Sequence, residues 1–208
     1  MKIVFATSEA NPYIKSGGLA DVLGSLPKAL VQKGHECIVV LPKYQDMELA
    51  DTIEYVTNYD IWVGWRKCYC GVFKAEYDGV TYYFIDNEQY FRRPGLYSYD
   101  DDNERFAFFD FAVLELLSHI DIKPDILHLH DWQTAMIATL YKERYAYYEY
   151  YQGIKIVFTI HNIAYQGKCD PALLSDHFGL DNYLYYNGNC RNDGCFNMMK
   201  AAIYYSDI

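Results

Sequence analysis

The chain has 208 residues, of which 51% are apolar and 22% charged, the composition of a soluble globular domain with one sizeable core. No apolar run reaches the roughly 18 to 20 residues that a membrane span needs. The formal net charge of −10 argues against a nucleic-acid backbone as the main partner, although a few local donors would suffice for a small phosphate ligand.

The chain starts directly in a strand-like run, Met1–Phe5, and no signal-peptide pattern precedes it. Six cysteines in a chain without an export signal are expected to be reduced, which predicts a cytoplasmic protein. Cys68 and Cys70 would share one face of a strand, while Cys190 and Cys195 lie in a polar loop without the paired spacing of a zinc site. We therefore expect no metal site and no cofactor.

The first segments have the pattern of a βαβ unit. Residues 2–7 form a short apolar run typical of a buried parallel strand, and residues 37–41 form a second one. Between them, Gly17-Gly18 opens a helical pattern in which Pro27 predicts a kink or a restart, with Ser25 available as a cap. Such a unit implies a right-handed crossover and a parallel sheet.

The next stretch changes character. Segments 60–67, 69–77 and 80–85 are rich in β-forming residues, and Asp78-Gly79 is a strong hairpin turn. We interpret this stretch as an antiparallel insertion beside the main sheet.

The rest of the chain again alternates between helix and strand patterns. We expect a helix over 103–119, a strand over 125–129, a helix starting at Asp131, a buried strand over 154–160 and a last helix over 196–205. The alternation predicts an α/β fold, namely a Rossmann-like, doubly wound, mostly parallel sheet with an antiparallel β insertion. The chain stops at what looks like the approach to a further strand, so we expect it to be part of a longer protein.

Polar clusters follow three of the predicted strands, at residues 8–21, 128–133 and 161–162. Because the carboxyl ends of parallel strands meet at one edge of a sheet, these clusters should converge there, where such folds bind ligands. Capping or turn chemistry would have to explain all three separately.

The first cluster has the features of a phosphate site. Gly17 and Gly18 at a helix N-terminus allow a ligand close to the backbone, free N–H groups favour an anion, and Lys15 adds a positive charge. Lys15 precedes the glycines, unlike the lysine of a Walker loop, and the G-x-G-x-x-G dinucleotide fingerprint is absent. The alternative is that the two glycines only ease packing of the helix on the strand.

The other two clusters offer side chains for hydrogen bonding. His161 and Asn162 could bind hydroxyls or stabilise developing charge, although a lone histidine is often structural. Asp131 could equally be no more than the N-cap of its helix.

Several strings resemble those of one enzyme family. Lys15–Val22 reads KSGGLADV, His130–Thr134 reads HDWQT and His161–Gly167 reads HNIAYQG. In this order and spacing they resemble signatures of bacterial glycogen synthases and plant starch synthases. Ser8-Glu9 and residues 90–95 also fit, so the likeness covers the whole chain.

The resemblance implies that the chain is the N-terminal half of a GT-B glycosyltransferase, with residues 1–208 forming one Rossmann-like domain and a C-terminal nucleotide-binding domain missing. The reaction would transfer glucose from ADP-glucose to the non-reducing end of an α-1,4-glucan such as glycogen, with retention of anomeric configuration. ADP rather than UDP rests on the resemblance alone. The isolated fragment should be inactive, because family residues that stabilise the donor lie in the missing half.

The resemblance also suggests roles on the donor side. Lys15 matches the donor-binding lysine, Gly17 and Gly18 would place N–H groups near the diphosphate, and Asp21 belongs to the same motif.

Around the transferred sugar, the resemblance suggests His161 as the histidine at that sugar, with Asn162 beside it. Glu9, Asp131 and Tyr90 match positions on the acceptor side, and His161, Asp131 and Glu9 are our candidate catalytic residues.

Two alternatives remain open. The 23 tyrosines, many of them within 141–151 and 183–186, could stack on sugars in a non-catalytic glucan-binding module, although packing is the more common use of such residues. A GT-B transferase that uses another sugar nucleotide would share the fold but is not expected to carry the KSGGLADV string.

Overall fold

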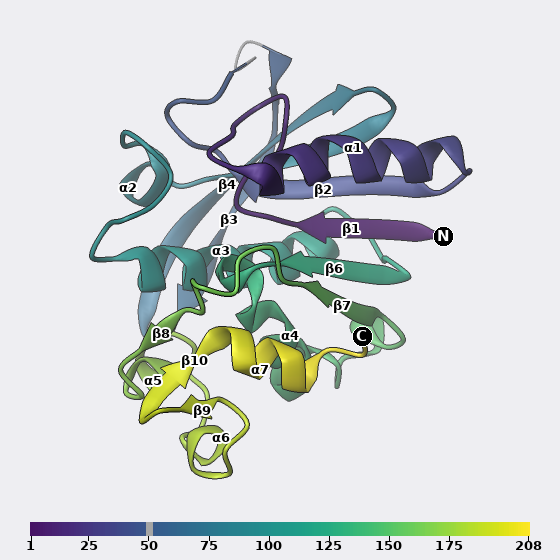
Figure 1. The fold of residues 1–208 in the computed structure, drawn as a ribbon. Helices are drawn as coiled ribbons and strands as arrows, with labels where there is room; N and C mark the ends of the chain where they lie inside the picture. Colours follow the sequence, from purple (N-terminus) through teal and green to yellow (C-terminus); the bar gives the residue numbers. More distant parts are fainter. Residues whose placement is uncertain (49–51) are drawn as a thin grey trace.

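A seven-stranded sheet with the order β3-β4-β5-β2-β1-β6-β7 organises the computed structural model, which describes residues 1–48 and 52–208 (Figure 1). Five consecutive strands of this sheet are parallel to one another. They are β5 (Val80–Asp86), β2 (Glu36–Pro42), β1 (Lys2–Ala6), β6 (Ile126–His130) and β7 (Lys155–Thr159). Mostly apolar runs that contain β-branched residues, such as KIVFA and ECIVVLP, suit strands that are covered on both faces.

Two antiparallel strands, β3 (Glu54–Val63) and β4 (Arg66–Tyr77), extend this sheet at one edge. The predicted insertion is therefore confirmed, but its boundaries were wrong. The first strand ends before Gly64, whose φ of 58° turns the chain, and a Cβ there would lie 1.8 Å from the carbonyl oxygen of Asp176. β5 belongs to the parallel part beside β2, and the hairpin turn between β4 and β5 is confirmed.

Helices cover both faces of the sheet (Figure 1). Helix α1 (Gly18–Gln32) connects β1 to β2, whereas α3 (Asp102–His119) connects β5 to β6 in the opposite direction across the sheet. Right-handed crossovers in opposite directions place the two helices on opposite faces. Helix α4 (Met136–Leu140) follows β6 on the face of α3, and α7 (Met198–Tyr205) packs against α4.

The predicted restart of the first helix is wrong, because α1 runs without a break through Pro27. The Ser25 hydroxyl does not cap a new helix; it donates to the carbonyl oxygen of Asp21 at 2.7 Å, inside the same helix. Pro27 lies on the buried face with Leu19 and Leu23, so packing of its ring offsets the lost backbone hydrogen bond.

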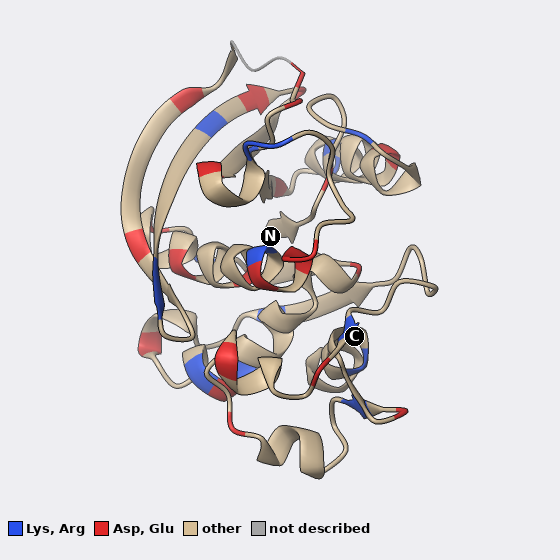
Figure 2. Cartoon of the chain, turned by 90° about the vertical axis from the view of Figure 1, so that its left-hand side faces the viewer, with Lys and Arg blue, Asp and Glu red and all other residues tan. Residues whose placement is uncertain are grey.

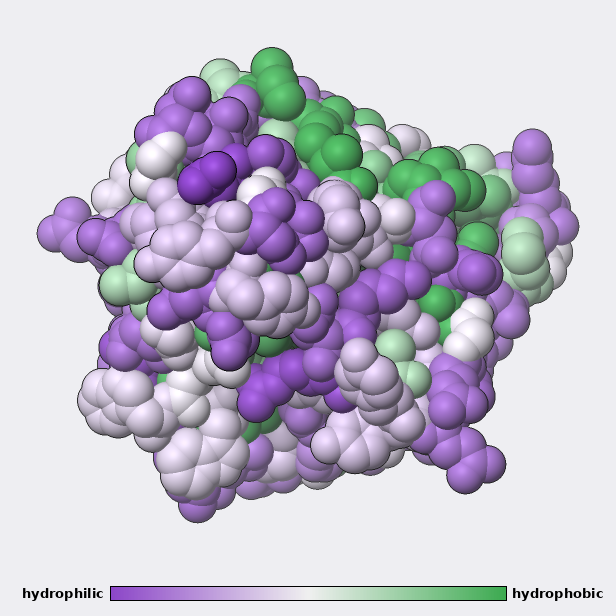
Figure 3. Space-filling model, turned by 90° about the horizontal axis from the view of Figure 1, so that it is seen from below, coloured by the Kyte–Doolittle hydropathy of each residue, from purple (hydrophilic) through white to green (hydrophobic). Residues whose placement is uncertain are grey.

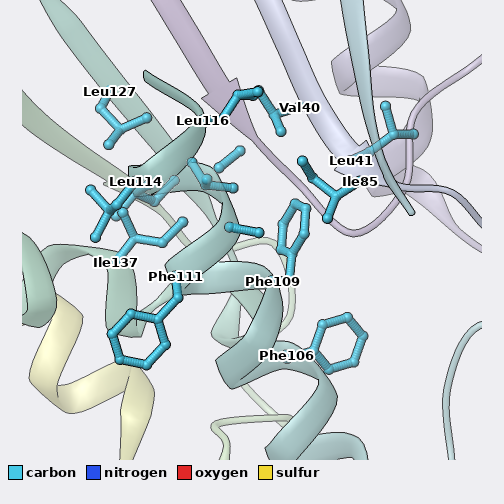
Figure 4. Close-up of a cluster of buried hydrophobic side chains, with 14 of the residues drawn as sticks. Val40, Leu41, Ile85, Phe106, Phe109, Phe111, Leu114, Leu116, Leu127 and Ile137 are labelled. Carbon is cyan, nitrogen blue, oxygen red and sulfur yellow. The ribbon is translucent and has the colours of Figure 1, made fainter. Parts of the chain in front are cut away.

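Helix α3 is buried on most sides because it lies between the sheet and the helices outside it. Figure 4 shows Phe109 of this helix close to Leu41 of β2 and Ile85 of β5. Burial so complete explains why the helix has little amphipathic pattern and is recognised by its length instead.

A buried arginine fastens the loop that precedes α3. Arg105 is fully buried, its Nε donates to Asp102 Oδ1 at 2.8 Å, and its guanidinium also donates to the carbonyl oxygens of Tyr90 and Leu96. Several donors of one planar group thus hold residues 90–102 on the carboxyl side of the sheet.

Short elements complete the fold. A three-stranded sheet in the order β8-β10-β9 lies below the main sheet in Figure 1. The short elements are α2 (Glu88–Phe91), the 3₁₀ helices η2 (Trp132–Thr134) and η4 (Glu149–Tyr151), the π-helix η3 (Tyr141–Tyr145), β8 (Lys168–Cys169), α5 (Leu173–Asp176), α6 (Tyr183–Tyr186), β9 (Arg191–Asn192) and β10 (Cys195–Asn197).

Two helix starts differ from prediction. The helix expected from Asp131 begins as a 3₁₀ turn and becomes α-helical only at Met136, and the last helix begins at Met198 because residues 195–197 form β10. The underside of the molecule is mostly polar, with apolar residues gathered toward one side of the view in Figure 3. No helix within the described ranges is long and apolar enough to cross a membrane.

Candidate active site

A large cavity lies where the winding of the sheet reverses. The chain leaves β1 toward β2 on one side, whereas β6 lies on the other side of β1, so the loops after β1 and β6 separate and leave a crevice. Figure 2 looks onto this edge of the sheet. The cavity has a volume of about 630 Å³. Its lining residues are Glu9, Ser16, Gly17, Gly18, Leu19, Tyr97, Ser98, Asp102, Asp131, Trp132, Gln133, His161, Asn162 and Tyr165.

Gly17 and Gly18 face this cavity, and neither the backbone conformation nor the packing within the protein requires glycine at these positions. Gly17 has extended dihedral angles, and a Cβ on it would meet only Glu9 Oε1, at 3.9 Å. A Cβ on Gly18 would meet no atom within 4 Å. The alternative that these glycines ease helix–strand packing is therefore wrong. The space in front of α1 is available to a ligand, and its helix dipole favours an anion there.

Glu9 holds the loop that leads into α1. Its carboxylate is buried, and Oε2 accepts hydrogen bonds from the backbone N–H of Ser16 and, at 3.3 Å, from that of Gly17. The expectation that Gly17 offers a free N–H to a ligand is thus not met in this structure. Among the described residues, no side chain caps the first-turn N–H groups from Gly18 onward, so they remain for an anion.

Lys15 and Asp21 lie at the rim and not in the lining of the cavity. The Lys15 ammonium is 2.7 Å from Asp21 Oδ1, and both side chains are about half exposed, at 48% and 54%. Asn11 also donates to Asp21, at 2.6 Å. The hydrogen bond from Lys15 is the main reason why the pKa of Asp21 is lowered. Asp21 therefore orients Lys15 beside the glycines.

Asp131 ties two of the predicted loops together. Its Oδ1 accepts hydrogen bonds from the backbone N–H of His161 at 2.7 Å and of Asn162 at 3.1 Å, and it makes no capping bond to the helix that follows. The N-cap alternative is therefore wrong. With φ 58° and ψ −176°, Asp131 occupies a region that is essentially reserved for glycine and costs about 1–3 kcal/mol. Strain of this kind is typical of functional sites.

His161 is linked to two further histidines. Its Nε2 lies 2.9 Å from His130 Nδ1, and the rings of His128 and His130 are 4.2 Å apart. Burial lowers the pKa of His128 to about 4. Burial and the two neighbouring histidines lower the pKa of the fully buried His130 well below its ordinary value. Both rings are therefore neutral near pH 7.

Tyr90 does not reach the cavity. It is 2% exposed, its hydroxyl donates to Glu104 Oε1 at 2.6 Å, and its ring packs 5.2 Å from that of Phe108. Burial raises the pKa of the phenol above its ordinary value. The expected acceptor-side role of Tyr90 is thus not supported, because α2 turns the side chain into the core.

Sequence reasoning did not single out several cavity residues. Gln133 is 8% exposed, and its Oε1 is buried without a hydrogen-bond partner among the described residues. Tyr97 donates to or accepts from Ser8 Oγ at 2.7 Å, and Trp132 and Tyr165 add aromatic surface. The HDWQT and HNIAYQG strings contain three of these residues and could have identified them. No pattern pointed to Tyr97.

Taken together, the cavity offers an anion site at the start of α1, polar groups at His161 and Asn162, and aromatic surface at Trp132 and Tyr165. No lysine or arginine is among its lining residues, so Lys15 at the rim is the nearest cation of this loop. Within the described ranges, no three His, Cys, Asp or Glu residues cluster as a metal site. This geometry suits a phosphate-bearing sugar compound whose charge is balanced partly from outside the cavity.

Comparisons with known proteins converge on one group. A family model described as the starch synthase catalytic domain matches residues 2–208. Glycogen synthase from Clostridium kluyveri is 50% identical over 209 residues, which is 100% of this chain and 44% of that protein. Glycogen synthase from Streptococcus agalactiae serotype Ia is 49% identical over 209 residues, again 44% of its length.

Among solved structures, the catalytic domain of starch synthase IV from Arabidopsis thaliana bound to ADP and acarbose matches with a TM-score of 0.90 at 33% identity. The match covers 100% of this chain and 43% of that one. The predicted fold class is thereby confirmed. The chain spans less than half the length of these relatives.

Proposed function

The chain belongs to the starch synthase catalytic domain family, and on that premise we propose that it is the N-terminal domain of a retaining ADP-glucose glucosyltransferase. The whole enzyme transfers glucose to the non-reducing end of an α-1,4-glucan and serves glycogen synthesis in the cytoplasm. The observation that carries the proposal is the open space at Gly18, where a helix N-terminus faces a cavity shared with His161. The names of its relatives and the six free cysteines support the product and the compartment.

The donor diphosphate binds at the start of α1. Gly18 lets the phosphate approach the helix N-terminus, and the unpaired N–H groups of the first turn donate to its oxygens. Lys15 turns from Asp21 toward the donor, an exchange that costs little because both side chains are solvent-exposed. ADP as the nucleotide is supported by the ligand named for the Arabidopsis structure.

The transferred glucose lies at His161 and Asn162, two polar residues that line the cavity. Asn162 Oδ1 accepts from the backbone N–H of Ala164 at 3.0 Å, which directs its amide nitrogen outward as a donor for a hydroxyl. Asp131 positions both residues through their backbone N–H groups and need not touch the substrate. Trp132 and Tyr165 provide stacking surface for the acceptor glucan.

No protein base is needed for this reaction, because the leaving phosphate can take the proton of the acceptor hydroxyl. The protein then acts by orienting the two substrates and stabilising charge. Since no cation lines the cavity on this side, most of the charge on the leaving diphosphate must be balanced by a second domain across the cleft. We place the nucleotide base pocket in that second domain.

A transfer assay tests the proposal. The intact protein that contains this chain should extend maltoheptaose by single glucose units from ADP-glucose, and the 208-residue chain alone should show negligible transfer. Lys15→Ala in the intact protein should weaken use of ADP-glucose, whereas Lys28→Ala, at a surface ion pair with Asp78, serves as the matched control. Absence of transfer by the intact protein, or efficient transfer by the chain alone, would refute the proposal.

If the intact protein binds maltoheptaose but transfers nothing, the alternative of a glucan-binding module becomes the better reading. Binding that survives both Lys15→Ala and His161→Ala would support that alternative, because neither residue would then contribute to the site.

A further inference from the structure

The hydrogen bond between the two histidine rings determines which nitrogen of His161 carries the proton. His130 Nδ1 and His161 Nε2 are 2.9 Å apart, and the rings are stacked with an interplanar angle of 30°. One of the two nitrogens must donate and the other accept. The geometry alone allows either direction, so the surroundings of His130 decide.

His130 has a single ring proton, because it is neutral. The residue is 0% exposed, and protonation would bury a positive charge beside the ring of His128. The proton is thus either on Nδ1, in the hydrogen bond to His161, or on Nε2.

His130 Nε2 is buried and has no hydrogen-bond partner among the described residues. A proton there would leave an N–H donor buried and unpaired, which proteins almost never tolerate, whereas an unpaired acceptor is less costly. The proton therefore lies on Nδ1, and His130 donates to His161 Nε2.

His161 must then accept at Nε2 and, when neutral, carries its own proton on Nδ1. The residue lines the cavity, its backbone N–H is held by Asp131, and Nδ1 has no protein partner in the described part of the chain. We propose that His130 is a positioning residue that selects the Nδ1–H form of His161, so that His161 offers a hydrogen-bond donor, and not an acceptor, to the ligand.

This inference rests on the proposed function only for the identity of the ligand. The group that fits an N–H donor in a sugar site is an oxygen that accepts, namely a hydroxyl of the transferred hexose acting through its lone pair. His130 itself does not touch the substrate, since it is fully buried behind His161. The fold supplies the arrangement, because β6 ends at His130 and the next strand, β7, ends just before His161.

The direct test is ¹⁵N NMR of the intact protein with labelled histidine, in which His161→Gln identifies the signals of His161. We expect a protonated Nδ1 and an unprotonated Nε2 for His161 above pH 7. A protonated Nε2 in the neutral ring would overturn the proposal. This NMR measurement does not depend on catalysis, so it tests the tautomer of His161 independently of the proposed function.

Two variants of His130 separate hydrogen bonding from packing. His130→Asn places an amide donor near the position of Nδ1 and should keep the Nδ1–H form of His161 and its turnover. His130→Phe keeps the stacked ring but removes the donor, so His161 should shift to the Nε2–H form and kcat/KM for ADP-glucose should fall roughly tenfold, the worth of one hydrogen bond. The matched control is His119→Gln, at a half-exposed histidine bonded to Glu115, and it should change neither readout.

The outcomes of this experiment are decisive in each direction. If His130→Phe folds and His161 keeps its proton on Nδ1, His130 does not select the tautomer and the proposal is wrong. If His130→Phe does not fold, the wild-type and His130→Asn spectra still decide. If the tautomers behave as expected while wild-type protein transfers no glucose, the proposed function fails and the inference about His130 stands.

Discussion

Replacement of Gly18 by alanine should separate stability from donor binding. Gly18 is the first residue of α1, its φ is not in the left-handed region, and a Cβ there would meet no protein atom within 4 Å. Alanine is favoured over glycine in a helix interior by about 1 kcal/mol, and roughly half of that is expected at a helix end. The Gly18→Ala protein should therefore be as stable as wild type or more stable by about 0.5 kcal/mol.

The same methyl group would occupy the space into which the donor phosphate must fit. Loss of close approach to the helix N-terminus should raise KM for ADP-glucose at least tenfold, which corresponds to about 1.4 kcal/mol of binding free energy. Urea unfolding and initial-rate kinetics on the intact protein measure the two effects. KM for maltoheptaose should change less, because the acceptor surface at Trp132 and Tyr165 is not altered.

Gly34 provides the matched control, because it ends the same helix far from the cavity with a φ of 85°. Gly34→Ala should lose about 1–2 kcal/mol of stability from the left-handed conformation and leave KM unchanged. An unchanged KM for ADP-glucose in Gly18→Ala would refute the reasoning, because the open space at α1 would then not be the donor site. A large loss of stability in that variant would equally contradict the open space around a Cβ at Gly18.

Three further predictions concern the supporting residues. Asp131→Ala should lose about 2 kcal/mol of stability and at least tenfold in kcat/KM, because two backbone N–H groups lose a charged acceptor. Asp131→Asn should retain most of the stability and of kcat/KM, and equal effects of the two substitutions would contradict this prediction. Tyr90→Phe should lower the urea midpoint by the equivalent of about 1 kcal/mol, through loss of the bond to Glu104, and leave KM for maltoheptaose unchanged; a raised KM would restore the acceptor role of Tyr90. Stability should fall by about 3 kcal/mol as the pH is lowered from about 6.5 toward 4, because the pKa of His128 is about 4 in the folded protein and the unfolded chain therefore binds the proton first. A His128→Gln protein whose stability depends on pH as steeply as that of wild type would contradict this prediction.

The fold was largely predictable because its main signals are local. Short apolar runs between turn residues identified four of the five parallel strands, whereas the fifth, β5, was assigned to the antiparallel insertion. The errors fall where tertiary contacts decide. Gly64 ends a strand because the chain approaches Asp176, more than 100 residues away, and Pro27 is accommodated because its ring packs in the core.

The sequence predicted which residues line the cavity better than it predicted the contacts that they make. His161, Asn162, Gly18 and Asp131 line one cavity, as expected from strand ends that share an edge. Sequence could not show that Glu9 occupies the N–H of Gly17, since that depends on a buried side chain folding back over the loop.

The same limit applies to Tyr90, which matched a family pattern yet points into the core. Its orientation is fixed by Glu104 on α3 and by packing on Phe108, contacts that no spacing in the sequence reveals. Tyr97 presents the opposite case, because the loop held by Arg105 carries it to the cavity.

Equilibrium binding of ADP-glucose tests the central claim most directly, because it requires the donor to occupy this cavity. Isothermal titration of the intact protein should give saturable binding that weakens at least tenfold in both Gly18→Ala and His161→Ala, while the control Gly34→Ala binds as wild type does. Equal affinity in all four proteins would place the donor elsewhere and contradict the account.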